Sequence, residues 1–385
     1  MLFWLNYENF RNDVSRDYNY EIFRKAMLLM TSSSDFCDFS RTSVRREEAL
    51  VVRQTLLSPN HLILASPAHF GKAALVRAVA KSLAHPLVEI DGRLVTGLTD
   101  ISAQLLKAAF RWLRPDDFRR SLLTFHRIPS ITTDLMTGQV HLSFTADTDP
   151  QQLLDESLSL LPSLTSLEKR LIVFWRNFPC LLDAAPHLER KLRALLETQD
   201  NVNHVFSGSP ERRMSEIFER ASAPFFHFGR WFPLSPIPED EIRAILAESF
   251  RPMSSEAAAQ TLAAALIQTV GTHPYYLRQA AETLRNFLPA DMPPDAETVR
   301  QMIEHIVFQK LWDYERLWDT FSQSQKKALQ LVVANQPFAG LPDFPATTLY
   351  SAAQKLQKAG LLIKTPAFEV EDPFLRRWIA SQQVA

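Results

Sequence analysis

Residues 66–73 have the types and spacing of a loop that binds phosphate. They read Ser-Pro-Ala-His-Phe-Gly-Lys-Ala and lie between an apolar run and a long helical pattern rich in Ala, Leu and Val. The phosphate-binding pattern GxxxxGK[ST] supplies backbone amides and a lysine for the phosphates, and a hydroxyl for magnesium. Gly71 and Lys72 match this pattern, whereas Ser66 replaces its first glycine and Ala73 its hydroxyl residue.

This partial match predicts an anion site that lacks its metal ligand. Lys72 would place a positive charge on β- and γ-phosphates, and the amides at the start of the helix, up to Ala74, would point at the same anion beside His69 and Phe70. Magnesium is not expected, because Ala73 has no oxygen to bind it. In the alternative interpretation the segment is an ordinary helix start, and its lysine is solvated or pairs with a neighbour.

A second apolar run, Leu171–Phe174, predicts the strand that would supply a metal-binding aspartate and an adjacent general base. The stretch LIVFWRNFPCLL contains no carboxylate. The acidic pair would fall on Arg176 and Asn177, or on Trp175 and Arg176 if the strand ends one residue earlier. A cation there opposes magnesium binding, and neither Asn nor Trp acts as a general base. The sequence therefore predicts that hydrolysis is impaired or absent.

The segments around these residues alternate between short apolar runs and helical patterns. Strands are expected at 62–65, 86–92, 171–174, 202–207 and 230–234. This alternation predicts an α/β fold, a parallel sheet with helices on both faces, in which Asp91 would lie at the carboxyl edge of its strand. A hairpin around Gly138 is expected within 126–144, and a helical stretch at 150–169.

The chain after Pro236 changes character and is helical throughout, up to a final order of helix, turn, helix and hairpin that is typical of a winged helix. We predict four parts in all. They are an N-terminal helical extension at 1–35, an α/β domain at 36–235, an all-helical domain at 236–320 and a winged-helix domain at 321–385.

The composition restricts the class of protein. With 385 residues, 46% hydrophobic, 22% charged and a net charge of −1, the chain is globular, with two or three domains expected and no global basic field. Cys37 and Cys180 stand in no metal-binding array, so neither a zinc site nor a disulfide scaffold is expected. The sequence has no signal-like segment and no run of 18 apolar residues, which predicts a cytoplasmic protein without membrane contact.

In the order of its motifs the chain resembles the AAA-type, STAND-like P-loop ATPases of bacteria and archaea that carry a C-terminal winged helix. The motifs are SPAHFGKAAL, LIVFWRNFPCLL, HVFSGSPERRMSEIF, GTHPYYLRQAAETL and EVEDPFLRRWI. The resemblance covers residues 36–385 and implies that the α/β domain is ATPase-like and that 236–320 is its lid. The sequence departs from the family pattern at Ser66, Ala73, Arg176 and Asn177. These departures put catalysis in doubt and leave the fold intact.

The resemblance also implies roles for residues outside the loop. His273 and Pro274 of the lid motif would approach the base or the phosphates of ATP or ADP, and Ser209 or Arg230 would act as sensors. The plainer interpretation of Gly-x-His-Pro is a helix N-terminus, since proline suits a first helical turn. For Arg230, next to Trp231, stacking or solvation is the plainer interpretation.

Three functions remain open from the sequence. The first is a switch that responds to ATP or ADP, and the second is a scaffold that has lost hydrolysis and recruits a protein partner. The third is a DNA-binding regulator that uses Lys355, Lys358 and Lys364 of the predicted winged helix. Residues 322–385 carry seven Lys or Arg against four Asp or Glu. This is less positive charge than a DNA-binding domain usually presents. The oligomeric state is not determined by any of these features.

Overall fold

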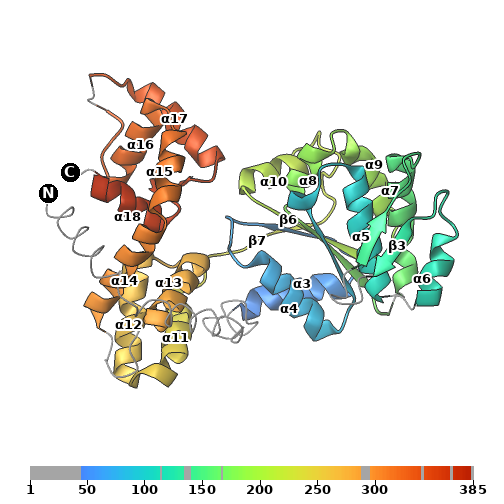
Figure 1. The fold of residues 1–385 in the computed structure, drawn as a ribbon, viewed down its shortest axis with the longest axis horizontal. Helices are drawn as coiled ribbons and strands as arrows, with labels where there is room; N and C mark the ends of the chain where they lie inside the picture. The colour runs from blue at the N-terminus through green and yellow to red at the C-terminus, as the bar shows by residue number, and fades with distance from the viewer. Residues whose placement is uncertain are drawn as a thin grey trace.

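The computed structural model of the chain describes residues 45–112, 115–133, 140–165, 168–287, 295–339, 342–364 and 367–382. Figure 1 shows two parts, an α/β part and a helical part, with the chain passing from one to the other after the last strand of the sheet. The predicted extension at 1–35, Cys37 and the turn at Gly138 lie outside the described residues.

The α/β part is built on a five-stranded sheet. Across the sheet the strands are β2 (Leu87–Asp91), β5 (Leu171–Arg176), β6 (Val202–Gly208), β1 (Leu62–Ala65) and β7 (Arg230–Pro233). All four neighbouring pairs are parallel, as predicted. The central strands β1, β5 and β6 are buried almost throughout, because helices cover both faces of a parallel sheet.

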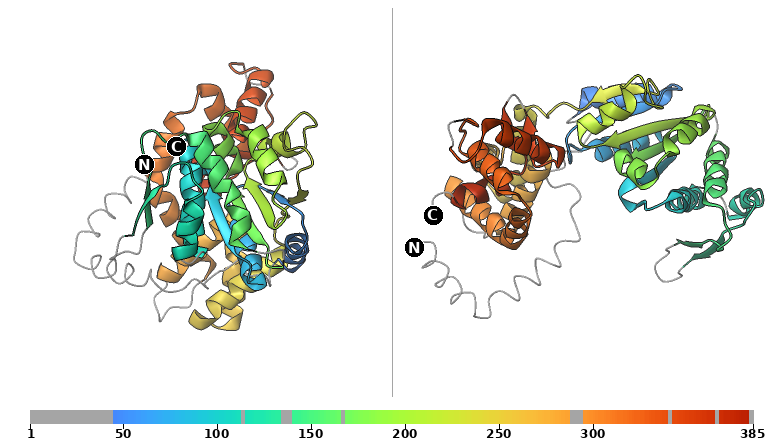
Figure 2. Two further views of the ribbon diagram at one scale, coloured as in Figure 1. Left: turned by 90° about the vertical axis from the view of Figure 1, so that its right-hand side faces the viewer. Right: turned by 90° about the horizontal axis from the view of Figure 1, so that it is seen from above.

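Helices pack on the two faces of the sheet in separate hydrophobic clusters. The helices of this part are α3 (Arg46–Leu57), α4 (Lys72–Leu83), α5 (Leu98–Trp112), α6 (Pro115–Leu122), α7 (Pro150–Ser159), α8 (Phe178–Ala184), α9 (Leu188–Glu197) and α10 (Glu211–Phe218), with 3-10 turns at Gly92–Leu94 and Leu161–Leu164. One face packs on α3 and α4, and the other on α5 and α7 to α10 (Figure 2). The predicted α/β architecture with helices on both faces is confirmed.

Two predicted boundaries were wrong. The strand predicted at 171–174 continues to Arg176. The helix predicted over 150–169 ends at Ser159 and is followed by a 3-10 turn that contains Pro162, since proline lacks the N–H that would continue an α-helix. The hairpin predicted within 126–144 is present as the antiparallel pair β3 (Ser130–Thr133) and β4 (Val140–Ser143).

The helical part follows β7. Its elements are α11 (Glu239–Phe250), a 3-10 turn (Arg251–Met253), α12 (Glu256–Val270), α13 (Pro274–Phe287), α14 (Ala296–Gln309), α15 (Leu311–Asp319), α16 (Gln323–Val333), α17 (Ala346–Lys358), β8 (Leu362–Lys364), β9 (Phe368–Val370) and α18 (Pro373–Gln382). The predicted order of helix, helix and hairpin is present in α16, α17 and the antiparallel pair β8–β9.

A single cluster of buried side chains extends from Ile237 to Ile379. The helices on either side of the boundary predicted at 320/321 therefore share a core. The division into four domains and the assignment of a winged helix stay predictions. Among the helices that the structure describes, none has the length and hydrophobicity that a membrane crossing requires.

Gly92 follows β2, opens a 3-10 turn and packs closely against the start of α8. A Cβ atom at this position would collide with the carbonyl oxygen of Asn177 and would lie 2.9 Å from the amide nitrogen of Leu181. Both are backbone atoms and cannot rotate away. We expect Gly92→Ala to lower the free energy of unfolding by about 1–3 kcal/mol, measured by urea denaturation. Gly97→Ala is the matched control, because no atom lies within 4 Å of a Cβ there, and an equal loss in the two variants would contradict the steric explanation.

Candidate functional site

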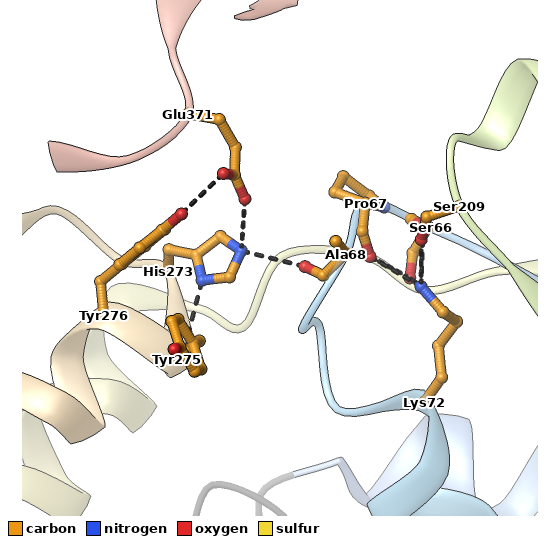
Figure 3. A network of polar contacts seen from close by, with 9 residues as sticks. All are labelled: Ser66, Pro67, Ala68, Lys72, Ser209, His273, Tyr275, Tyr276 and Glu371. Atoms are coloured by element: carbon orange, nitrogen blue, oxygen red, sulfur yellow. Dashed lines mark hydrogen bonds and ion pairs between the residues drawn. The ribbon is translucent and has the colours of Figure 1, made fainter. Parts of the chain in front are cut away.

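Lys72 is held by the loop in which it stands. Its Nζ atom donates to the carbonyl oxygens of Ser66 (2.8 Å) and Pro67 (2.7 Å), and it contacts the hydroxyls of Ser66 (3.0 Å) and Ser209 (3.1 Å). The Ser209 hydroxyl in turn donates to the Ser66 carbonyl at 3.0 Å. Figure 3 shows this group of contacts between the strand ends and the start of α4. The ammonium group is therefore bonded to neutral oxygens, and an anion at the loop would have to replace them.

Burial sets the charge of this lysine. Desolvation lowers the pKa of Lys72 to about 8, and the carboxylate of Glu211 opposes part of that shift. The lysine therefore stays mostly protonated at pH 7. A buried cation with only neutral partners gains strongly from a negatively charged ligand.

The start of α4 offers backbone amides beside this cation. Gly71 precedes the helix with φ 85°, in the left-handed region that suits glycine. The Leu75 amide donates to the Gly71 carbonyl at 3.0 Å. Within the part of the chain that the structure describes, no acceptor is seen for the amides of Lys72, Ala73 and Ala74, as is general for a first helical turn. These amides can bind an anion, whereas the methyl group of Ala73 provides no oxygen for a metal.

The end of β5 places Trp175 and Arg176 on opposite faces of the sheet. Side chains alternate along a strand, and Ile172 and Phe174 belong to the cluster that packs on α4. Arg176 is the next residue on that face, while Trp175 belongs to the cluster on the opposite face. This placement favours Arg176 and Asn177 over Trp175 and Arg176 as the positions expected to be acidic, and the assignment stays a prediction.

Carboxylates from the neighbouring strand β2 surround Arg176. The Arg176 Nη1 atom lies 3.5 Å from Oε2 of Glu89 and 3.5 Å from Oδ2 of Asp91. The Asn177 amide donates to Oδ1 of Asp91 at 2.7 Å. Asp91 lies at the carboxyl edge as predicted, but its carboxylate is shared between an arginine and an asparagine. Among the described residues, no group of three or more His, Cys, Asp or Glu side chains is placed to hold a metal ion.

His273 connects the loop to the helical part. Its Nδ1 atom accepts the Tyr275 amide N–H at 3.3 Å, so the ring proton is on Nε2, which donates to the Ala68 carbonyl at 3.2 Å. Burial lowers the pKa of His273 to about 4, which keeps the ring neutral at pH 7. Pro274 follows as the first residue of α13, as the plainer sequence interpretation has it.

Glu371 extends this connection into the C-terminal elements. Its Oε1 atom lies 3.6 Å from the Nε2 atom of His273, and its Oε2 atom accepts a hydrogen bond from the Tyr276 hydroxyl at 2.6 Å (Figure 3). Burial raises the pKa of Glu371. The loop after β1, the start of α13 and the segment after β9 thus meet at one histidine.

Aromatic rings pack the middle of the loop against α13. The His69 ring stacks on Tyr275 with centroids 4.5 Å apart, and the Phe70 ring meets His273 edge-on at 5.1 Å. His69 has φ 58°, a left-handed conformation that is uncommon outside glycine. The loop conformation therefore depends on contacts with the helical part as well as on its own hydrogen bonds.

A cleft of about 1130 Å³ lies between the loop and the C-terminal elements. Among its lining residues are Pro67, Ala68, His69, Arg93, Cys180, Ser209, Glu211, Tyr275, Lys358, Lys364 and Glu371. Lys355 lines a separate hollow of about 420 Å³ between α16 and α17. Of the three lysines predicted for DNA, two therefore face the α/β part.

The structure brings together most of the residues predicted for the site. It joins residues 66–74 to Ser209 and to His273. It leaves Arg230 apart, because Arg230 pairs with Leu62 at the opposite end of β1, three residues or about 10 Å from the loop, and is exposed. Sequence reasoning missed the parts played by Tyr276 and Glu371, although both stand in motifs that carry the family resemblance.

Solved structures show what this fold is similar to. A Walker-type ATPase of Pyrococcus abyssi superposes with a TM-score of 0.62 at 14% identity, over 87% of this chain and 95% of that one. The ORC2 protein of Aeropyrum pernix, in its ADPNP–ADP complexes, superposes with a TM-score of 0.52 at 13% identity, over 89% of this chain and 95% of that one. Comparison of the sequence with protein-family models and with curated proteins gives no match. At these identities the likeness establishes the fold, which is that of the P-loop ATPases.

Proposed function

We propose that this protein is a nucleotide-responsive switch that binds ADP or ATP at residues 66–74, with metal-dependent hydrolysis impaired or absent, and that it acts through a protein partner. The observation that carries the proposal is the position of His273. It hydrogen-bonds the loop through Ala68 and lies beside Glu371 of the C-terminal elements. A phosphate that reshapes the loop must therefore change the contacts of the helical part.

Loss of hydrolysis is supported by two separate elements. Ala73 gives no metal ligand at the start of α4, and Arg176 with Asn177 gives neither a carboxylate for a metal ion nor a base at the end of β5. The helix N-terminus and Lys72, which serve anion binding alone, are in place. The ORC2 protein, which shares the fold, was solved with ADPNP and ADP.

The arrangement of α17 and β8 favours the switch over a protein that binds DNA directly. Lys358 and Lys364 line the cleft that faces the α/β part, so the two parts would have to separate before these lysines reached a duplex. DNA binding stays the alternative function. A steep fall in affinity for duplex DNA with increasing salt would support it.

Calorimetry and a distance measurement test the switch together. We expect ADP and ATP to bind with or without Mg²⁺, and no Mg²⁺-stimulated release of phosphate. Spin labels at Lys81→Cys on α4 and Ser351→Cys on α17, in a chain without its two native cysteines, report the distance between the parts. We expect ADP to change that distance. Absence of binding heat at millimolar nucleotide, or Mg²⁺-stimulated turnover, would contradict the proposal.

A further inference from the structure

Along the direction of the strands, Arg176 at the end of β5 lies at nearly the same level as the end of β1, where the loop at residues 66–74 begins. In the register of the strands, Trp175 pairs with Phe206, and Gly208, two residues further along β6, pairs with Ala65 at the end of β1. Arg176 is therefore within one residue of the level of Ala65. One strand stands between β5 and β1, so the two backbones are about 10 Å apart. A triphosphate that starts at the α4 N-terminus can span this gap together with an arginine side chain.

The side chain of Arg176 points to the face of the sheet that α4 covers. It follows Ile172 and Phe174, which pack in the cluster on that face, and Ala73 packs against the same cluster. The guanidinium group is therefore on the side of the sheet where the loop pattern places its metal ion, and where Ala73 leaves no ligand for one.

The donors of Arg176 are largely unused. Glu89 is bonded more closely by Arg77, whose Nε and Nη2 atoms lie 2.6 and 2.7 Å from its two oxygens. Asp91 is bonded more closely by Asn177, at 2.7 Å. Arg176 keeps only two longer ion pairs at 3.5 Å, and no hydrogen bond from its side chain to any described residue is seen. The guanidinium group of Arg176 has up to five N–H donors in a planar fork. It is held at the strand end by its two ion pairs.

We infer that Arg176 binds the terminal phosphate of a nucleoside triphosphate and replaces the metal ion of this site. The inference rests on the proposed nucleotide site at residues 66–74. A guanidinium fork matches two phosphate oxygens and brings a positive charge to them. A diphosphate ends one phosphate earlier and leaves Arg176 with its carboxylates. Arg176 thereby lets the site distinguish a nucleoside triphosphate from a nucleoside diphosphate without magnesium.

Titration of the full chain with ATP and with ADP, in EDTA and in Mg²⁺, tests this role. We expect the wild-type affinity for ATP to be the same in both buffers. Arg176→Ala should weaken ATP binding about tenfold, the loss of one charge-assisted contact, and change ADP binding less than twofold. Arg190→Ala, exposed on α9 across the sheet, is the matched control and should change neither affinity.

Three results of these titrations would contradict the inference. A wild-type requirement for Mg²⁺, an equal loss of ATP and ADP binding in Arg176→Ala, or no loss at all would overturn it. Circular dichroism checks that the variant folds. If it does not, Arg176→Lys decides, since it keeps the charge without the fork and should weaken ATP binding a few-fold more than ADP binding. A wild-type chain that binds neither nucleotide shows that the proposed function itself is wrong, before any substitution is made.

Discussion

Acidification from pH 7 to pH 5 is expected to destabilise the protein strongly, because two histidines of the α/β part, the half-buried His61 and the buried His204, are held in the neutral form. Burial, and after it the charge of Arg170, lowers the pKa of His61 to about 4. His204 lies on β6, fully buried, where its Nδ1 atom accepts a hydrogen bond from Trp175 at 3.2 Å. Burial holds the pKa of His204 well below its usual value.

In the unfolded chain both histidines titrate near pH 6.5, so that chain binds protons first as the pH falls. The stability that these groups contribute is therefore complete above pH 6.5 and is lost as the pH falls below 6.5, for His61 down to about pH 4. For His61 alone, a shift from 6.5 to about 4 corresponds to a loss of about 2 kcal/mol at pH 5. His204 adds to the loss in the same direction.

Urea unfolding at pH 7, 6 and 5 measures this loss. In the double variant His61→Asn, His204→Gln, both side chains keep a hydrogen-bond acceptor and lose their titration, so we expect a flatter dependence of stability on pH, in which the contribution of His273 remains. His141→Gln, exposed on β4, is the control and should follow the wild type. Equal slopes in the wild type and the double variant would show that other groups cause the acid sensitivity.

The sequence predicted the sheet well, for a physical reason. Strands buried on both faces are continuous apolar runs, so β1, β5 and β6 stand out without any knowledge of their partners. The end of β5 did not stand out, because Arg176 interrupts the apolar run while it continues the strand. Its carbon stem and its ion pairs with β2 keep the arginine at the strand edge.

The candidate site also contains contacts that the sequence predicted and contacts that it did not. Residues 66–74 were predicted because loop and helix start are contiguous in the chain. The contact of His273 with Glu371 joins positions 98 residues apart, on two elements whose packing decides whether they meet. His69 and Tyr275, whose rings stack, give no periodic signal at all. Such contacts follow only from the tertiary arrangement.

Replacement of Lys72 by alanine is expected to weaken the binding of ADP and ATP about 100-fold, the loss of two charge-assisted hydrogen bonds. The expected effect is large because Ala73 provides no oxygen for a metal ion, so Lys72 is the cation of the loop that meets the phosphates of both ADP and ATP. Folding should be affected much less. The Ser209 hydroxyl still donates to the Ser66 carbonyl, and the Pro67 carbonyl lies at the cleft, where water can replace the ammonium group.

The pH dependence of binding distinguishes a direct contact with Lys72 from a general disturbance of the loop. The pKa of this lysine in the free protein is about 8, and a bound phosphate raises it, so affinity should fall about fivefold from pH 8 to pH 9 as the free lysine loses its proton. The residual binding of Lys72→Ala should stay constant over this range. Lys81→Ala, exposed at the other end of α4, should keep both the affinity and its pH dependence. Equal pH profiles in the wild type and Lys72→Ala would mean that Lys72 stays on Ser66, Pro67 and Ser209 and never meets the phosphate.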